Sequence, residues 1–95
     1  MIVNNVLIKL KSRDADSVKQ TQDVLLSMNG KIGVLLDIQA EVNIRPDQAN
    51  YDLILITKFA SLEDLDMYLV HPVHLEVAKF IGSLLDTQAS VCYEI

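Results

Sequence analysis

The amino-acid sequence predicts an α+β fold, in which helices cover a four-stranded antiparallel sheet. Two observations carry this expectation. Four segments alternate apolar and polar residues with the period of two that is typical of strands, whereas others repeat apolar residues at the helical spacing of three and four. With 95 residues, of which 51% are hydrophobic, we expect one domain over residues 1–95, with a core that needs no disulfide or metal.

The first strand and the first helix are predicted over residues 2–11 and 15–29. Asn4 is the polar member of the otherwise apolar strand face that is expected to meet the core. An amide in that position needs a hydrogen-bonding partner or a ligand. The helix is expected to end at Asn29-Gly30, because glycine takes the left-handed conformation at a helix end without a side-chain clash.

Two further strands are predicted over residues 34–44 and 51–59, joined by a turn over residues 45–50. The earlier strand has one apolar and one largely polar face, so that at least part of it meets water. The later strand carries apolar residues on both faces, and therefore both of its sides need cover.

The second helical region is predicted to break at Pro72. A short helix, one side of which is lined by Leu62, Leu65, Tyr68 and Leu69, must end before this proline, because proline disfavours helical geometry in the residue ahead of it. Proline is favourable as the first residue of a new helix, and apolar residues then recur at helical spacing as far as Leu85. Residues 89–95 alternate again and predict the closing strand.

The order β-α-β-β-α-β, with right-handed crossovers, gives a ferredoxin-like four-stranded antiparallel sheet. The helices can cover only one face of this sheet. The apolar residues on the other side of the first and third strands then need a second sheet, most simply from an identical chain. We therefore expect a homodimer that packs sheet against sheet.

Charge and cysteine content narrow the classes of partner. The chain has 8 Lys and Arg against 13 Asp and Glu, and its net charge of -5 repels phosphate backbones, so nucleic acid is not an expected partner. The single cysteine, Cys92, excludes an internal disulfide and fits a reducing compartment. No segment reaches the roughly 18 continuous apolar residues of a membrane span. We expect a cytoplasmic protein that does not associate with a membrane.

Both histidines lie in one short segment, His71-Pro72-Val73-His74. A shared metal is not expected, because Pro72 leaves His71 outside the helix that carries His74, and the chain has no third histidine or cysteine pair to complete a zinc site. His71 is most simply the residue at which the helix begins.

His74 is the candidate for proton chemistry. It belongs to the core-facing stripe and to the first helical turn, where burial and the unsatisfied N–H groups both favour a neutral imidazole that accepts or relays a proton. The alternative is a histidine at the edge of the core that makes one hydrogen bond. Tyr68 and Asn4 could converge on the same space, although Tyr68 could equally serve only to fill the core.

Three stretches, M-I-V-N-N-V-L-I-K-L-K, Y-D-L-I-L-I-T-K-F-A-S-L-E-D-L and Y-L-V-H-P-V-H, resemble the stress-responsive A/B barrel (Dabb) family over essentially the whole chain. The H-P-x-H segment is the most specific part of this resemblance. It implies a small ferredoxin-like chain that forms a dimeric α+β barrel through its sheets. Most members of the family have no established activity.

The resemblance also implies site residues. In a plant polyketide cyclase of this family, which closes a linear polyketide by an aldol reaction without a cofactor, the catalytic histidine matches His74 and a supporting tyrosine matches Tyr68. The cyclase has a histidine where this chain has Asn4, and an amide cannot transfer a proton at neutral pH. Asn4 therefore puts the cyclase reaction itself in question.

Two functions follow as expectations, and neither requires a cofactor. One is a homodimer that binds a small, partly apolar ligand, with Asn4 and His71 as candidate ligand-binding residues. The other is a lyase or cyclase, with His74 as general base, Tyr68 orienting the substrate and Asn4 polarising its carbonyl group.

Overall fold

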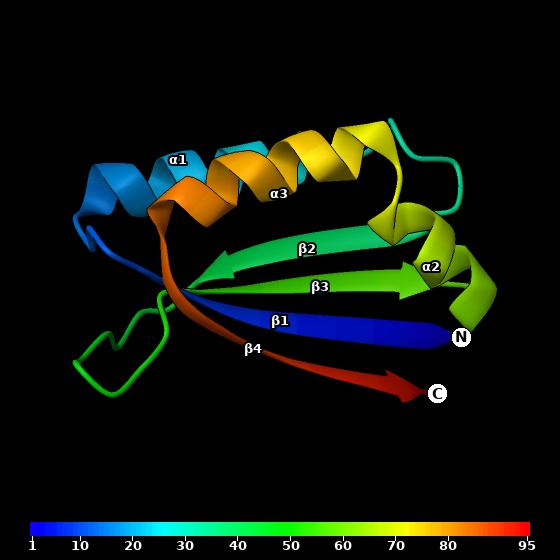
Figure 1. Cartoon of the computed structure of the whole chain (residues 1–95). Coiled ribbons are helices and arrows are strands. Elements are labelled where there is room, and N and C mark those ends of the chain that lie inside the picture. Colours follow the sequence, from blue (N-terminus) through cyan, green and yellow to red (C-terminus); the bar gives the residue numbers. More distant parts are fainter.

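The computed structural model describes all 95 residues and confirms the predicted α+β, ferredoxin-like fold (Figure 1). The elements follow in the order β1 (Ile2–Leu10), α1 (Ala15–Leu26), β2 (Asp37–Val42), β3 (Leu53–Phe59), α2 (Leu62–Leu69), α3 (Pro72–Leu84) and β4 (Leu85–Glu94). The predicted break at Pro72 is also confirmed, since this proline is the first residue of α3 and a short turn separates it from α2.

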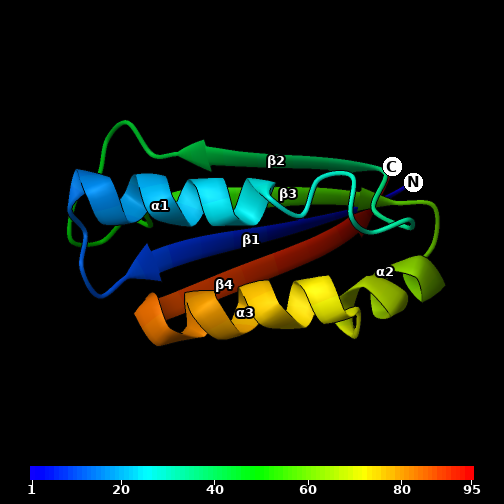
Figure 2. The same ribbon diagram turned by 90° about the horizontal axis from the view of Figure 1, so that it is seen from above.

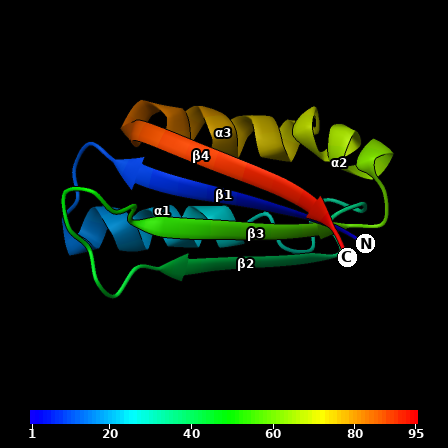
Figure 3. The same ribbon diagram turned by 90° about the horizontal axis from the view of Figure 1, so that it is seen from below.

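The four strands form one antiparallel sheet in the order β2-β3-β1-β4. The helices α1 and α3 lie side by side on one face of the sheet, as Figures 1 and 2 show. Viewed from below, the other face carries no helix (Figure 3). We call the covered side the inner face and the bare side the outer face.

Strand pairing assigns each side chain to a face, because residues directly opposite one another in an antiparallel ladder point to the same side. Asn4 is opposite Thr57 of β3 and Cys92 of β4, all on the inner face. The outer face carries a set of apolar residues from three strands, which we call the outer-face patch: Val3, Leu7, Ile54, Ile56, Val91 and Tyr93.

The predicted bounds of the helix at 15–29 and the strand at 34–44 are wrong. The helix α1 ends at Leu26, and a series of turns follows that includes Gly30, whose φ of 79° requires a left-handed backbone. The strand β2 is shorter than predicted because it is an edge strand that pairs with β3 alone, and its partners extend only from Lys58 to Leu53.

The last two strands also differ from their predicted bounds. The strand β3 begins at Leu53 rather than at residue 51. The strand β4 begins at Leu85 rather than at residue 89, because it pairs with β1 up to Leu10 across a shift in register. Distant partners, and not the local alternation, therefore determine where these strands begin and end.

The hydrophobic core lies between the inner face and the helices, and it is tighter under α1 than under α3. Three residues of α1 are buried, whereas α3 buries only Ile81 along its length. The strand β4, which is the edge strand on that side, is exposed over nearly all of its residues. This unequal packing leaves free space beneath α3.

Candidate functional site

A cavity of about 480 Å³ lies between α3 and the inner face of the sheet. Most of its lining is apolar, with 12 hydrophobic residues among 17. The polar side chains that reach it are Asn4, Tyr68, His74, Gln88 and Ser90. The structure therefore brings together three of the four site residues predicted from the sequence, and His71 is not among the lining residues.

Asn4 lies in the middle of β1, half-buried on the inner face. Thr57 donates a hydrogen bond of 3.5 Å to its main-chain oxygen, but the side-chain amide of Asn4 has no partner within the protein. Because every fully buried polar side-chain atom does have a partner, this amide must reach the cavity rather than lie sealed in the core. It can donate and accept hydrogen bonds there.

Tyr68 lines the cavity, and only 2% of its surface is exposed. Its ring contacts Phe59, with ring centroids 5.0 Å apart, and its hydroxyl donates weakly to the sulfur of Met28 at 3.9 Å. Burial raises the pKa of Tyr68 to about 12, so the hydroxyl remains protonated throughout the physiological range. A thioether sulfur is a weak acceptor, and a ligand oxygen would compete with it effectively.

His74 has a defined tautomer. Its Nδ1 lies 3.0 Å from the main-chain oxygen of Leu69, and a carbonyl oxygen can only accept, so Nδ1 carries the hydrogen and Nε2 carries the lone pair. The ring packs against Tyr68 with centroids 4.4 Å apart. Nε2 has no protein partner and is not fully buried, and the residue lines the cavity. His74 therefore offers the cavity a hydrogen-bond and proton acceptor.

The protonation state of His74 agrees with this geometry. Desolvation by burial lowers its pKa from the usual 6.5, and the hydrogen bond to Leu69 opposes this shift only in part. The ring is consequently neutral at pH 7. The neighbouring Tyr68 is neutral as well, so the polar end of the cavity holds hydrogen-bonding groups without charge.

His71 lies outside the cavity at the N-terminus of α3. Its Nδ1 accepts the N–H of Val73 at 3.1 Å, which makes it the N-cap of this helix. Sequence reasoning placed it at the beginning of the helix, and the structure agrees.

Gln88 and Ser90 were missed as cavity residues. Both lie on β4, whose inward side chains beyond Leu85 are mostly polar, while Val91 and Tyr93 point outward. The alternation of β4 is visible in the sequence, but the direction of each set depends on its pairing with β1. The edge position of β4 explains why a polar inner face is tolerated there.

No group of three or more His, Cys, Asp and Glu residues in the structure lies close enough together to hold a metal ion. None of the helices combines the length and the apolar character that crossing a membrane would need.

Solved structures share this fold at low sequence identity. A dimeric protein of unknown function with a ferredoxin-like fold from Bacteroides fragilis superimposes with a TM-score of 0.83 and 23% identity, covering 99% of this chain and 95% of that one. A hydroxynitrile lyase from Passiflora edulis gives a TM-score of 0.84 at 15% identity, covering 99% and 92% of the two chains. A Dabb family protein from Mesorhizobium loti gives 0.85 at 17% identity, covering 99% and 95%.

Among curated proteins, no sequence matches the chain significantly. The family model of the stress responsive A/B barrel domain, however, matches residues 2–95. This match covers nearly the whole chain and agrees with the observed element order and sheet topology. The protein therefore belongs to the stress responsive A/B barrel (Dabb) family.

Proposed function

We propose that this protein is a homodimer that binds a small, partly apolar ligand in the cavity beneath α3. The cavity itself carries this proposal. Its volume of about 480 Å³ lies within the range of small-molecule sites, and an apolar lining with a few convergent polar groups is the usual composition of such sites. Asn4 and Nε2 of His74 both lack a protein partner at the cavity, which gives a ligand two polar contacts.

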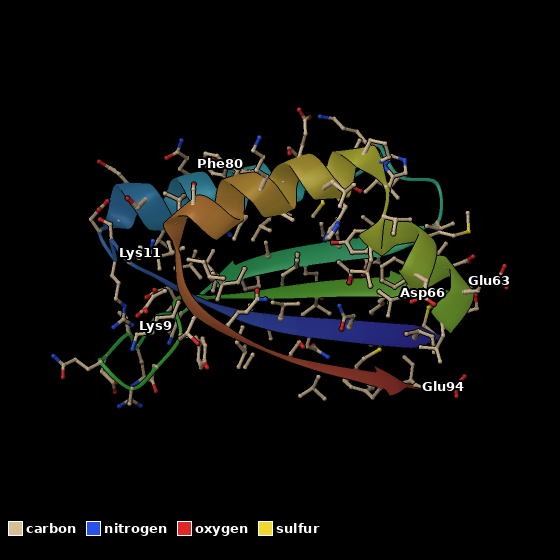
Figure 4. All side chains as sticks on the ribbon, viewed as in Figure 1. Lys9, Lys11, Glu63, Asp66, Phe80 and Glu94 are labelled. Atoms are coloured by element: carbon tan, nitrogen blue, oxygen red, sulfur yellow. The ribbon has the colours of Figure 1, made fainter.

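The lining favours a ligand without charge. None of the lining residues is Lys, Arg, Asp or Glu. Figure 4 shows the labelled charged side chains at the ends of the molecule, outside the layer between helices and sheet: Lys9, Lys11, Glu63, Asp66 and Glu94. A charged ligand would lose its hydration in the cavity without gaining a partner of opposite charge, and the net charge of -5 further disfavours anions.

The outer-face patch supports the homodimer. Its members on the inner strands are half-buried or buried, but Val91 and Tyr93 on β4 are 66% and 47% exposed. A contiguous apolar surface on a sheet that helices leave bare is typical of an interface. The similar protein from Bacteroides fragilis is dimeric.

The exposed, unpaired Cys92 fits a reducing compartment, and we propose that the protein is located in the cytoplasm.

The ligand proposal is tested with a matched pair of probes, hexanamide and hexanoate, titrated into isotope-labelled protein and followed by NMR. Hexanamide is expected to shift the signals of residues around the cavity and to bind at least tenfold more tightly than hexanoate. Gly82 lines the cavity, and a Cβ atom added there meets no atom within 4 Å. The variant Gly82→Phe should fill this space and abolish binding, whereas Gly82→Ala should bind as the wild type does.

Equal affinity of wild type and Gly82→Phe for hexanamide would contradict binding in this cavity. Mass spectrometry of the native protein, applied to a freshly purified sample, would identify a ligand that is carried through purification.

A second function, a cofactor-independent lyase or cyclase, is favoured by one observation. The hydrogen bond from Nδ1 of His74 to Leu69 leaves the lone pair of Nε2 free to accept a proton, and the same carbonyl would stabilise the imidazolium that forms. The protonated hydroxyl of Tyr68 would orient the substrate, and the amide of Asn4 would donate to a carbonyl oxygen on which negative charge develops. The hydroxynitrile lyase from Passiflora edulis has the same fold.

This function is tested by the exchange of hydrogen for deuterium next to the carbonyl of 2-heptanone in heavy water, measured by NMR. The wild type should accelerate the exchange over buffer, and His74→Gln should remove the acceleration. An equal rate for the two proteins would exclude His74 as the base. Binding of 2-heptanone without accelerated exchange would leave the protein as a binding protein only.

A further inference from the structure

The two histidines of the H-P-x-H segment bind one main-chain donor and one main-chain acceptor. In an uninterrupted helix, these two main-chain groups would form a hydrogen bond with each other. In an uninterrupted helix, the N–H of Val73 would donate to the carbonyl oxygen of Leu69, four residues earlier. Here the N–H of Val73 donates instead to Nδ1 of His71 at 3.1 Å. The carbonyl oxygen of Leu69 accepts instead from Nδ1 of His74 at 3.0 Å.

Pro72 explains why this hydrogen bond is missing. Proline has no N–H, and its ring clashes with the carbonyl four residues earlier, which here is that of Tyr68. It also forces the preceding residue out of helical geometry, and His71 accordingly has a ψ of 137°. The chain therefore breaks between α2 and α3, and both the N–H of Val73 and the carbonyl of Leu69 need new partners.

We propose that His71 is a positioning residue for His74, and that it acts by capping the N–H of Val73, which fixes the first turn of α3, and with it His74, relative to the carbonyl oxygen of Leu69. In this position of the turn, the carbonyl of Leu69 has one donor, Nδ1–H of His74. This hydrogen bond fixes the tautomer of His74 and leaves Nε2 as the acceptor at the cavity. His71 thus acts on the tautomer of His74 through the helical turn that it caps.

The capping role is replaceable in a predictable way. Asn, Asp and Ser are the usual N-cap residues, because their short side chains accept from the N–H groups of the first helical turn. His71→Asn should therefore cap Val73 and preserve the arrangement. His71→Ala should leave the N–H of Val73 without its cap, so that the first turn of α3 frays and the hydrogen bond from Nδ1–H of His74 to the carbonyl of Leu69 is no longer held in place.

The test observes the two ring nitrogens of His74 directly, by ¹⁵N NMR of the labelled 95-residue protein at a pH at which the ring of His74 is neutral. In the wild type, Nδ1 should give the shift of a protonated nitrogen and Nε2 that of an unprotonated one. In His71→Ala, both signals should move toward intermediate values as the two tautomers exchange. In His71→Asn, the wild-type pattern should return.

Ser61→Ala is the matched control, because Ser61 caps the adjacent helix α2 through the N–H of Asp64 at 3.1 Å but does not contact the break. It should lower stability to a similar degree and leave the His74 pattern unchanged. The inference is overturned if His71→Ala keeps the wild-type pattern, or if Ser61→Ala changes it as strongly. It is overturned as well if His71→Asn folds but loses the fixed tautomer, and this outcome remains readable even if His71→Ala does not fold.

This inference deepens the proposed role of His74, yet its test uses no ligand. A fixed tautomer without binding of hexanamide would count against the proposed function alone. Binding together with an unchanged tautomer in His71→Ala would count against the positioning role alone.

Discussion

At the scale of single residues, the site consists of polar groups held in apolar surroundings without compensating charges. His74 packs against the buried ring of Tyr68, and the shifts in pKa of both residues arise first from desolvation. Burial favours the neutral form of each group. The cavity is therefore lined by one neutral acceptor, His74, and one neutral donor, Tyr68.

The lowered pKa of His74 makes stability depend on pH. The folded pKa lies below the 6.5 of an exposed ring, so the unfolded chain binds a proton more readily than the folded one. The contribution of His74 is fully present above pH 6.5 and is lost as the pH falls from there through the folded pKa. Urea unfolding of wild type and His74→Gln across this range should show the larger loss in the wild type. An NMR titration that gives His74 a pKa above 6.5 would contradict this prediction.

The side-chain amide of Asn4 has no partner within the protein. We expect the folded state to be less stable with this amide than with an apolar side chain, whereas the amide serves ligand binding. Asn4 is half-buried on a largely apolar cavity wall, and an apolar side chain of similar size there removes more nonpolar surface from water than the amide does. Asn4→Leu should therefore raise the free energy of unfolding by about 1 kcal/mol and weaken the binding of hexanamide. Urea denaturation and NMR titration measure the two effects. A clear loss of stability would show that the amide has a structural role.

At the scale of elements, the break between α2 and α3 determines where the site lies. An unbroken helix would continue the direction of α2, whereas the break at Pro72 lets α3 run back over the sheet and places His74 in its first turn. Only Ile81 of α3 is buried, so this helix forms one wall of the cavity without filling it with side chains. Figure 2 shows α3 alongside β4, the strand whose inner face is polar.

The loose packing of α3 predicts that it tolerates a stabilising substitution at the cavity wall. Gly82 is helical, and a Cβ added there meets no atom within 4 Å. Glycine inside a helix is less favourable than alanine by roughly 0.5–1 kcal/mol, so Gly82→Ala should raise the free energy of unfolding by about that amount. Thermal unfolding followed by circular dichroism measures the change. A lower melting temperature would mean that α3 packs more tightly than the structure indicates.

At the scale of the whole molecule, the two faces of the sheet differ in what they contact. The inner face carries the core and the cavity, and the outer-face patch offers an apolar surface with no cover in the single chain (Figure 3). Association through the outer face would therefore leave the cavity on the opposite side of the sheet, beneath α3.

The dimer interface is testable with one exposed residue. Val91 is 66% exposed on the outer face, so Val91→Lys should fold normally but place a charge in the proposed interface. Light scattering should then give the mass of one 10.6 kDa chain for this variant and twice that mass for the wild type. Leu75→Lys, at a residue of α3 that is 53% exposed, is the control and should remain dimeric. A monomeric wild type at micromolar concentration would exclude the homodimer.

Much of the fold could be predicted because it depends on local patterns. The alternation in strands, the helical stripe after Pro72 and the capping residues are properties of neighbouring side chains, and the inward direction of Asn4 and His74 follows from the same periods. The bounds of β2 and β4 could not be predicted, because a strand extends only as far as its partner does. The polar inner face of β4 was missed for the same reason.

The sequence by itself therefore determined the order of the elements, the break at Pro72 and the two candidates, Asn4 and His74, that point inward. Only the tertiary structure decided that Asn4 and His74 line one cavity, that the carbonyl of Leu69 orients the ring of His74, and that His71, already expected at the start of the helix, does not line the cavity. The physical reason is that periodicity follows from the local backbone. Free volume and hydrogen-bond partners, in contrast, depend on how segments that are distant in the chain pack against one another.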